Sequence, residues 1–395
     1  MLITHLSLTN FRNFLSLELD LPAHIMVFQG GNAQGKTNLL ESIYLLATAR
    51  SLRARTDREL INWEANKEHL PFARLWAEVQ RASGPVKVEL GLQGHRENTD
   101  KVSEQPSLYV NKRIRVNGIA RRAVDLVGQM QVVMFGSQDI DLVGGAPALR
   151  RRYLDIALSQ MDARYLRSLQ AYNRIILQRN HLLRLIKEGR ATANQLAFWD
   201  DELVNTGSYL TVQRQRAIVA LADLAAVTHR QLTGGQEVLQ VIYVGSVGKQ
   251  VEGSDEETQL DTVAGAFREE LRVAQAREID RGMTLVGPHR DDLQLLANGV
   301  DMGVFASRGQ QRTIAISLKL AEASLMQAKT GDQPILLLDD VLSELDAERG
   351  RQLLKSATGY QQVLITTTSE PGNLEPDVLA QATRFKVQQG RIERL

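Results

Sequence analysis

The sequence contains no cysteine, which excludes disulfide bonds, thiolate catalysis and cysteine-ligated zinc. It has no apolar run of about 18 residues or more and no charged-then-apolar leader, so neither membrane spanning nor secretion is expected. Its seven histidines lack the spacing of a metal site such as HExxH. Aromatic residues make up only 5% of the chain and the three tryptophans are dispersed, which argues against stacking of single-stranded bases.

The remaining composition is that of a cytoplasmic globular protein. With 395 residues, of which 43% are hydrophobic and 24% charged, the chain can bury one large core or two moderate ones. The formal net charge is only +1, so total charge alone predicts no polyanionic partner. Function must therefore be sought in local motifs.

A glycine-rich segment near the start of the chain fits the phosphate-loop pattern GxxxxGK[ST]: Gly30-Gly31-Asn32-Ala33-Gln34-Gly35-Lys36-Thr37. Residues 25–29 before it form an apolar run typical of a buried strand, and residues 37–46 have apolar residues at helical spacing. A glycine-rich turn could match by chance, but this strand, loop and helix order is the one that the motif requires. The segment predicts a nucleotide triphosphate site.

The residue types of this loop suit phosphate chemistry. Glycines let backbone N–H groups point toward one centre, and the helix N-terminus adds positive dipole. Lys36 is expected to reach the β and γ phosphates, and Thr37 to offer its hydroxyl to Mg²⁺. We expect the nucleotide to contact the loop residues and Asn38 in the first turn of the helix.

Two carboxylates end a second apolar run. Residues 335–338 show no alternation, as in a central parallel strand buried on both faces, and Asp339 and Asp340 follow. Ligands of open α/β sheets bind at this edge, and phosphoryl transfer needs a carboxylate for Mg²⁺ and a group that orients the attacking water. We assign Asp339 to the metal and Asp340 to the water. The alternative is that both are solvated turn residues.

A third motif, Ser307-Arg308-Gly309-Gln310-Gln311, precedes residues 313–327, which are predicted to form an amphipathic helix. A Ser-x-Gly-Gln sequence that opens a helix shortly before a strand ending in acids is the arrangement of the ABC-type ATPase signature. In that class the signature faces the γ-phosphate bound to a second subunit. Ser307 could also be an ordinary N-cap, and the two roles are compatible. Residues 343–346 resemble the D-loop, which crosses the dimer interface in such enzymes.

The whole set of motifs resembles the RecF family, in the SMC-like branch of the ABC ATPases, over essentially the full chain. Four blocks match in the family's order: 6–14, 145–155, 286–292 and 338–346. The resemblance implies a weak DNA-dependent ATPase of bacterial recombinational repair that uses ATP and Mg²⁺. It also implies a homodimer that closes on ATP and DNA and helps RecO and RecR load RecA at gapped or junction DNA. Arg12 would approach the bound nucleotide.

Three departures from the family pattern limit what can be carried over. Gln138 stands before Asp139 where the family usually has proline, and it is our candidate for the glutamine that senses Mg²⁺ and water, with Gln131 as the rival. Residues 50–53 replace a family Ser-His-Arg. The histidine that follows the last core strand in many ABC ATPases is replaced within 366–368 by threonines, whose hydroxyls could contact the γ-phosphate instead.

Basic residues are unevenly distributed. Residues 146–190 contain ten basic against three acidic residues, an excess of seven, and a second basic stretch covers 112–122. Such faces are usually solvated. On an SMC-like ATPase they favour contact with the phosphate backbone of duplex DNA or of a single-strand/duplex junction. The candidate DNA-binding residues are Arg150, Arg151, Arg164, Arg167 and Arg174.

The patterning predicts an α/β ABC-type ATPase head, with a mixed sheet around the phosphate loop and an inserted, mainly helical second lobe. The ATPase lobe is expected to be discontinuous, 1–135 and 284–395, with 136–283 as lobe II. Long helices are predicted over 147–186 and 195–232, and a polar surface loop over 245–258. No heptad run is long enough for an extended coiled coil.

Two other classes of protein share some of these motifs. Another SMC-like ATPase, serving a different DNA-maintenance process, would have the core motifs but not the block at 145–155. A P-loop GTPase needs an Asn-Lys-x-Asp element, and the two Asn-Lys pairs at 66–67 and 111–112 are not followed by that aspartate. A small-molecule kinase would leave residues 307–311 without a role.

Overall fold

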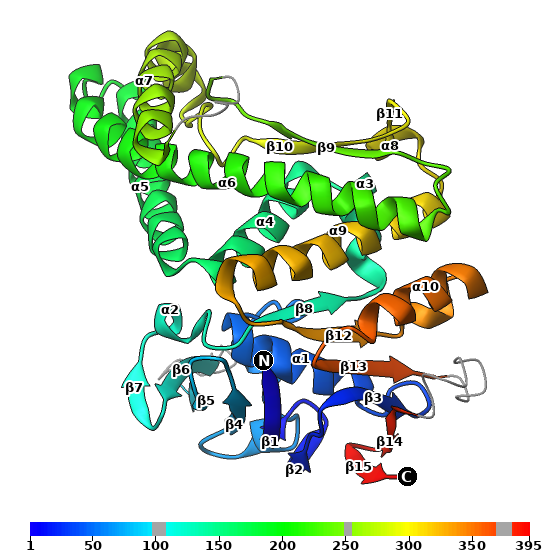
Figure 1. The fold of residues 1–395 in the computed structure, drawn as a ribbon. Helices are drawn as coiled ribbons and strands as arrows, with labels where there is room; N and C mark the ends of the chain where they lie inside the picture. Colours follow the sequence, from blue (N-terminus) through cyan, green and yellow to red (C-terminus); the bar gives the residue numbers. More distant parts are fainter. Residues whose placement is uncertain (97–107, 249–254, 369–380) are drawn as a thin grey trace. The chain divides into compact units, whose positions relative to one another are not determined.

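The computed structural model describes residues 1–96, 108–248, 255–368 and 381–395 (Figure 1). The chain folds into two compact units, of which unit 1 contains 1–139 and 322–395 and unit 2 contains 140–321. The sequence patterning predicts the return to the ATPase lobe at 284. Of the surface loop expected at 245–258, residues 249–254 lie outside the described residues.

Unit 1 contains a six-stranded sheet that holds both predicted nucleotide motifs. Its strands are ordered β15-β14-β3-β13-β12-β8, all parallel except β15. In chain order they are β3 (His24–Gln29), β8 (Val132–Phe135), β12 (Ile335–Asp339), β13 (Gln362–Thr367), β14 (Thr383–Gln388) and β15 (Arg391–Arg394). The first four residues of β12 are buried, as the apolar run predicted for a central strand.

A second, antiparallel sheet of unit 1 has the order β2-β1-β4-β5-β6-β7. Its strands are β1 (Leu2–Phe11), β2 (Phe14–Asp20), β4 (Phe72–Gln80), β5 (Val86–Arg96), β6 (Leu108–Val116) and β7 (Ile119–Arg121). Buried and exposed residues alternate along β4, as expected for a sheet with one covered face. Helix α1 (Lys36–Thr48) contacts strands of both sheets, which explains why almost all of its residues are buried.

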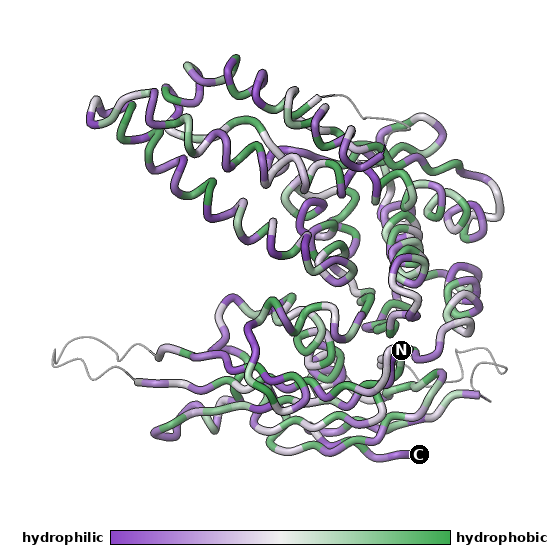
Figure 2. The backbone as a smooth tube through the Cα atoms, turned by 60° about the vertical axis from the view of Figure 1, so that its left-hand side comes forward, coloured by the Kyte–Doolittle hydropathy of each residue, from purple (hydrophilic) through white to green (hydrophobic). Residues whose placement is uncertain are grey.

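Unit 2 is mainly helical. Its helices are α3 (Asp141–Gly144), α4 (Pro147–Met161), α5 (Ala163–Lys187), α6 (Leu196–Leu232), α7 (Glu256–Arg281) and α8 (Met302–Phe305). The helix predicted over 147–186 is divided at Asp162, whose side chain accepts a hydrogen bond from the Arg164 N–H and so caps α5. Apolar and polar residues alternate along these helices (Figure 2), as expected where one face is buried.

A small antiparallel sheet, ordered β11-β10-β9, explains the later boundary. Strand β10 (Asp292–Ala297) pairs with β9 (Leu239–Val244) and β11 (Val300–Asp301), so the chain after 284 completes unit 2 before it returns to unit 1. Helix α9 (Arg308–Thr330) contains the boundary. Sequence periodicity could not reveal this pairing because its partners are distant in the chain.

Most of the remaining helical elements are short. They are η1 (Asp57–Leu60), η2 (Ala65–Lys67), α2 (Ala123–Leu126), η3 (Ser137–Ile140), η4 (Ala193–Gln195), η5 (Val341–Glu344) and α10 (Ala347–Ala357). Within the described ranges the helices form no extended coiled coil, since the longest, α6, packs against α5, α7 and β9. No described helix is long and apolar enough to cross a membrane.

Candidate nucleotide site and signature helix

The phosphate loop connects β3 to α1, as the sequence predicted. Its backbone is bent at Ala33 and Gly35, which have φ angles of 61° and 114°. Gly30 is required by close approach, because a Cβ there would lie 2.3 Å from the carbonyl oxygen of Val387. The glycines at positions 30 and 35 are therefore needed for the shape of this loop.

Neighbouring segments hold this loop in place. Asn13 Nδ2 donates to the carbonyl oxygen of Gln34 at 3.0 Å, and Asn13 Oδ1 accepts from Asn38 Nδ2 at 2.8 Å. The side-chain oxygen of Gln34 accepts from the N–H of Gln389 at 2.7 Å. The turn after β1 and the turn before β15 thus fix the loop that the nucleotide would contact.

Lys36 lies across its own loop. Its Nζ donates to the carbonyl oxygens of Gly30 and Gly31 at 2.7 and 2.8 Å, and the residue is only 7% exposed. Burial lowers the pKa of Lys36, and attraction to Asp340 and Asp339 opposes that shift. An ammonium group has three donors, so the third N–H of Nζ can still serve a phosphate oxygen while these two bonds are kept.

Thr37 and Asp339 meet although they are far apart in the sequence. Thr37 Oγ1 donates to Asp339 Oδ1 at 2.9 Å, and Thr366 Oγ1 donates to the same oxygen at 2.8 Å. Burial raises the pKa of Asp339, while the hydrogen bonds from Thr366 and Thr37 act in the opposite direction. Two of the three residues predicted for the Mg²⁺ site, Thr37 and Asp339, are therefore adjacent, and both offer the hard oxygen ligands that this cation prefers.

Asp340 has a strained backbone and a free carboxylate oxygen. Its φ angle is 53°, and its N–H donates to Thr366 Oγ1 at 3.0 Å. Its Oδ1 is buried and has no hydrogen-bond partner among the described residues. A buried carboxylate oxygen without a protein donor is suited to accept from a water molecule.

The direction of β8 separates the two candidate glutamines. Gln138 is exposed in η3, just beyond the end of β8, which runs parallel to β12 with Phe135 opposite Leu338. It therefore lies at the sheet edge that carries Asp339. Gln131 precedes β8 at the opposite edge, where its side chain is buried and accepts from Thr330 Oγ1. The geometry favours Gln138.

Arg12 is already engaged by a buried acid. Its guanidinium makes a two-pronged ion pair with Glu41 at 2.8 and 2.9 Å and donates to the Glu59 carbonyl oxygen. Glu41 is 1% exposed on α1, and its carboxylate also accepts from Ser51 Oγ. Sequence reasoning did not single out Glu41, although an acidic residue on an otherwise buried helix was a usable signal.

An open cavity of about 410 Å³ adjoins the first turn of α1 at Asn38. It is lined by Arg12, Asn13, Asn38, Arg53, Glu59, Ile61 and Trp63. Trp63 is 64% exposed, and Lys67 Nζ lies 4.3 Å from its ring centre. Arg53 belongs to residues 50–53, which the sequence marked only as a departure from the family pattern, and no local signal marks Trp63.

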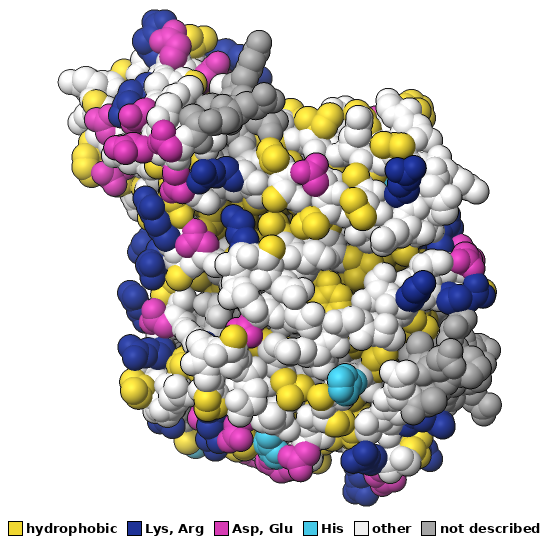
Figure 3. Space-filling model, viewed as in Figure 1, with side chains coloured by type: hydrophobic (Ala, Val, Ile, Leu, Met, Phe, Trp, Pro, Cys, Tyr) yellow, Lys and Arg dark blue, Asp and Glu magenta, His cyan; other side chains and the backbone are white. Residues whose placement is uncertain are grey.

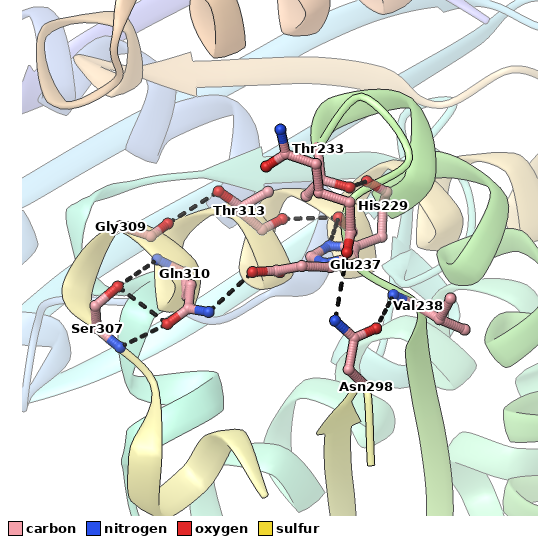
Figure 4. A network of polar contacts seen from close by, with 11 residues as sticks. His229, Thr233, Glu237, Val238, Asn298, Ser307, Gly309, Gln310 and Thr313 are labelled. Atoms are coloured by element: carbon pink, nitrogen blue, oxygen red, sulfur yellow. Dashed lines mark hydrogen bonds and ion pairs between the residues drawn. The ribbon is translucent and has the colours of Figure 1, made fainter. Parts of the chain in front are cut away.

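The signature opens α9 with a reciprocal cap (Figure 4). Gln310 Oε1 accepts from the Ser307 N–H and from Ser307 Oγ, both at 3.1 Å, and the Gln310 N–H donates to Ser307 Oγ at 3.3 Å. Ser307 and Arg308 are exposed, and Gly309 is half-buried. Ser307 therefore caps the start of α9 through its hydroxyl. The surface of this turn is still exposed to solvent.

The predicted DNA-binding arginines divide into two groups. Arg150 makes a two-pronged ion pair with Asp292 at 2.7 and 2.8 Å, and Arg151 donates to the Asp291 carbonyl oxygen. Arg179, counted in the basic excess, is fully buried against Asp200 and Glu278. These contacts argue against a phosphate-binding role for Arg150 and Arg151. The two side chains instead connect the sequence blocks 145–155 and 286–292.

Arg164, Arg167 and Arg174 are exposed on α5. Basic side chains gather over this helix in Figure 3. Arg164 also lies over the Tyr209 ring at 4.2 Å and 3.8 Å from Glu256. This face of α5, formed by Arg164, Arg167 and Arg174, keeps its charge available to a ligand.

A parallel sheet with a phosphate loop, an acidic strand end and a separate signature helix defines an ABC-type ATPase head. The family model described as RecF/RecN/SMC N terminal domain matches residues 2–390. An Smc head has the same fold, with a TM-score of 0.51 at 12% identity, covering 100% of this chain and 98% of that one.

The chain belongs to the RecF family. It is 44% identical to "DNA replication and repair protein RecF" of Roseiflexus castenholzii, over 99% of both chains, and 44% identical to that of Chloroflexus aurantiacus with the same coverage. It superposes on a solved structure of "the recombination mediator protein RecF-ATP" with a TM-score of 0.84 and 32% identity, covering 100% of this chain and 97% of that one.

Proposed function

We propose that this protein is an ATP-dependent DNA-binding switch of recombinational repair and replication restart. It dimerises on ATP and DNA and helps RecO and RecR load RecA at gapped or junction DNA. The observation that carries the proposal is the contact of Thr37 with Asp339, which joins the phosphate loop to the acidic strand as a Mg²⁺-nucleotide site requires. Full-length similarity to RecF proteins supports the DNA-repair role.

In this proposal ATP lies along the phosphate loop and its base enters the cavity beside Trp63. Thr37 and Asp339 would hold Mg²⁺, which would neutralise phosphate charge, and Gln138 follows β8 at the same edge of the sheet. Lys36 donates to the β and γ phosphates, and Asp340 orients the attacking water through its unpartnered oxygen. Turnover is slow and depends on DNA.

Sedimentation with and without ATP, repeated with duplex and gapped DNA, tests the switch as a whole. We expect monomers without nucleotide, dimers with ATP, and further stabilisation of the dimer by DNA. A chain that remains monomeric with ATP and DNA would contradict the proposal.

Replacing Ser307 with arginine should prevent dimerisation without affecting nucleotide binding by the monomer. The exposed first turn of α9 faces the partner's γ-phosphate in this proposal, so a bulky cation at its start would block approach. We expect ATP affinity within about twofold of wild type, dimerisation weakened by about 100-fold and hydrolysis reduced to the same degree. Equilibrium titration and sedimentation measure the two effects.

A mixture of Ser307→Arg and Lys36→Met proteins provides the control. A dimer containing one copy of each can form at most one competent site, so activity should recover only partly. Full activity of Ser307→Arg alone would show that the site is not shared.

Reversing the charges of Arg164, Arg167 and Arg174 together should weaken DNA binding at every sequence. The slope of log K against log salt should become shallower by about one for every phosphate group that is no longer bound. The matched control reverses Arg268, Arg272 and Arg277, which are exposed on α7 and change the net charge equally. Equal effects in both triple variants, measured by titration at several salt concentrations, would indicate a general charge effect and no α5 contact.

A further inference from the structure

A chain of polar contacts connects the signature to the interior of unit 2 (Figure 4). Gln310 Nε2 donates to Glu237 Oε1 at 2.9 Å. The other oxygen of Glu237 lies 3.0 Å from His229 Nε2. His229 Nδ1 lies 3.0 Å from Ser317 Oγ, whose hydroxyl donates to the Thr313 carbonyl oxygen.

This chain of contacts touches α9 twice. Gln310 and Ser317 are seven residues apart, which places them on the same face of the helix two turns from each other. His229 is completely buried, and the Glu237 side chain is 20% exposed. Hydrogen bonds to a carboxylate are stronger in such surroundings than in water. We call Glu237 and His229 the brace of α9.

Hydrogen bonds of the backbone fix the turn that carries the brace. The Gly235 N–H donates to the Arg230 carbonyl oxygen, and the Thr233 N–H and Oγ1 both donate to the His229 carbonyl oxygen. On the other side of Glu237, the Val238 N–H donates to Asn298 Oδ1 at 2.9 Å. The Glu237 carboxylate is therefore presented from a fixed turn between α6 and β9.

An ionised carboxylate only accepts hydrogen bonds, whereas a glutamine amide has one donating and one accepting end. Glu237 therefore fixes which way the Gln310 amide points. With Nε2 toward Glu237, Oε1 must face Ser307, where it accepts from both the N–H and the hydroxyl. Without the carboxylate, the amide could rotate and present its NH₂ to the Ser307 N–H, which would open the cap.

We propose that Glu237 is a positioning residue of the signature: by orienting Gln310 it sets the first turn of α9 that meets the nucleotide of a second copy. This role rests on the proposed action of the signature across a dimer. Glu237 belongs to the turn that joins α6 to β9, so the helical unit controls the geometry of the signature directly.

The first test measures hydrogen exchange of a peptide covering 304–314 in the nucleotide-free monomer, and then ATP-dependent dimerisation. Glu237→Ala should speed exchange at Gln310 and Gln311 and weaken dimerisation, each by about tenfold, with ATP affinity unchanged. Glu237→Gln should stay within about threefold of wild type, because its Oε1 can still accept from Gln310. Gln236→Ala, at the exposed neighbouring residue, is the matched control.

Swapping the residue types at positions 237 and 310 tests whether the orientation of the Gln310 amide matters. Gln310→Glu places two carboxylates against each other and should weaken dimerisation by about tenfold. Adding Glu237→Gln should restore it, since the amide introduced at position 237 can donate to the new carboxylate while its oxygen accepts from His229. A residue that merely filled space would not give this rescue, and the pair decides the question even if Glu237→Ala fails to fold.

Hydrogen-exchange rates and dimerisation that are unchanged in Glu237→Ala would overturn the proposed role of the brace. A double variant that dimerises no better than Gln310→Glu would overturn it as well. If wild-type protein does not dimerise with ATP, the proposed function fails. The exchange measurements on the monomer still decide whether Glu237 orders the signature.

Discussion

Lys36→Met should weaken ATP binding by about 100-fold while leaving the fold intact. Lys36 is the positive side chain of the phosphate loop, and charged hydrogen bonds of this kind contribute about 1.5–3 kcal/mol each. Its Nζ also donates to the Gly30 and Gly31 carbonyl oxygens, so methionine removes these bonds too. It also removes the cost of burying an ammonium group, the main cause of the lowered pKa of Lys36. We therefore expect little net loss of stability.

Equilibrium titration with ATP, accompanied by thermal unfolding, measures both quantities. Lys36→Arg is the charge-conserving control. Its planar guanidinium cannot replace a compact ammonium group, so we expect binding with poor hydrolysis. Unchanged ATP affinity in Lys36→Met would show that residues 30–37 do not form the nucleotide site.

Asp340→Asn should abolish hydrolysis and leave ATP binding in place. Its buried Oδ1, which has no hydrogen-bond partner in the part of the chain that the structure describes, is the group that we assign to the attacking water. An amide is a far poorer base than a carboxylate. Loss of such a group typically lowers kcat by about 10²–10⁴-fold. Asparagine also tolerates the positive φ of this position, so the backbone should not change. The variant should accumulate as an ATP-bound dimer on DNA.

Asp339→Asn provides the contrast. Its carboxylate meets Thr37 at 2.9 Å, so replacing it should weaken Mg²⁺-dependent ATP binding as well as hydrolysis. Single-turnover hydrolysis and sedimentation with ATP separate the two variants. Asp340→Asn that hydrolyses ATP at the wild-type rate, or that fails to dimerise with ATP, would refute this division of labour.

The motifs were predictable because their chemistry lies in consecutive residues. The phosphate loop and the acidic strand follow from pattern alone, and both are located where parallel strands end, as expected. Contacts between distant residues were harder. A charge count could not show that Arg150 and Arg179 are neutralised by Asp292 and Glu278, because ion-pair partners are chosen by the fold.

The same limit applies to the unit boundary and to the choice between glutamines. Pairing of β9 with β10 joins residues about fifty positions apart, and no local period reports it. Gln131 and Gln138 are similar in sequence terms, but one precedes β8 and the other follows it. The direction of β8 then places them at opposite ends of that strand.

The order of strands around β3 has a consequence for synthesis of the protein. Both neighbours of β3 in the parallel sheet, β13 and β14, come from residues after 361. The strand that carries the phosphate loop is synthesised before unit 2, whereas both of its sheet partners are synthesised after unit 2. Until they emerge, β3 exposes two unpaired edges and depends on the rest of the nascent chain to keep it from aggregating. A growing chain therefore acquires the capacity to bind ATP only after unit 2 has been synthesised.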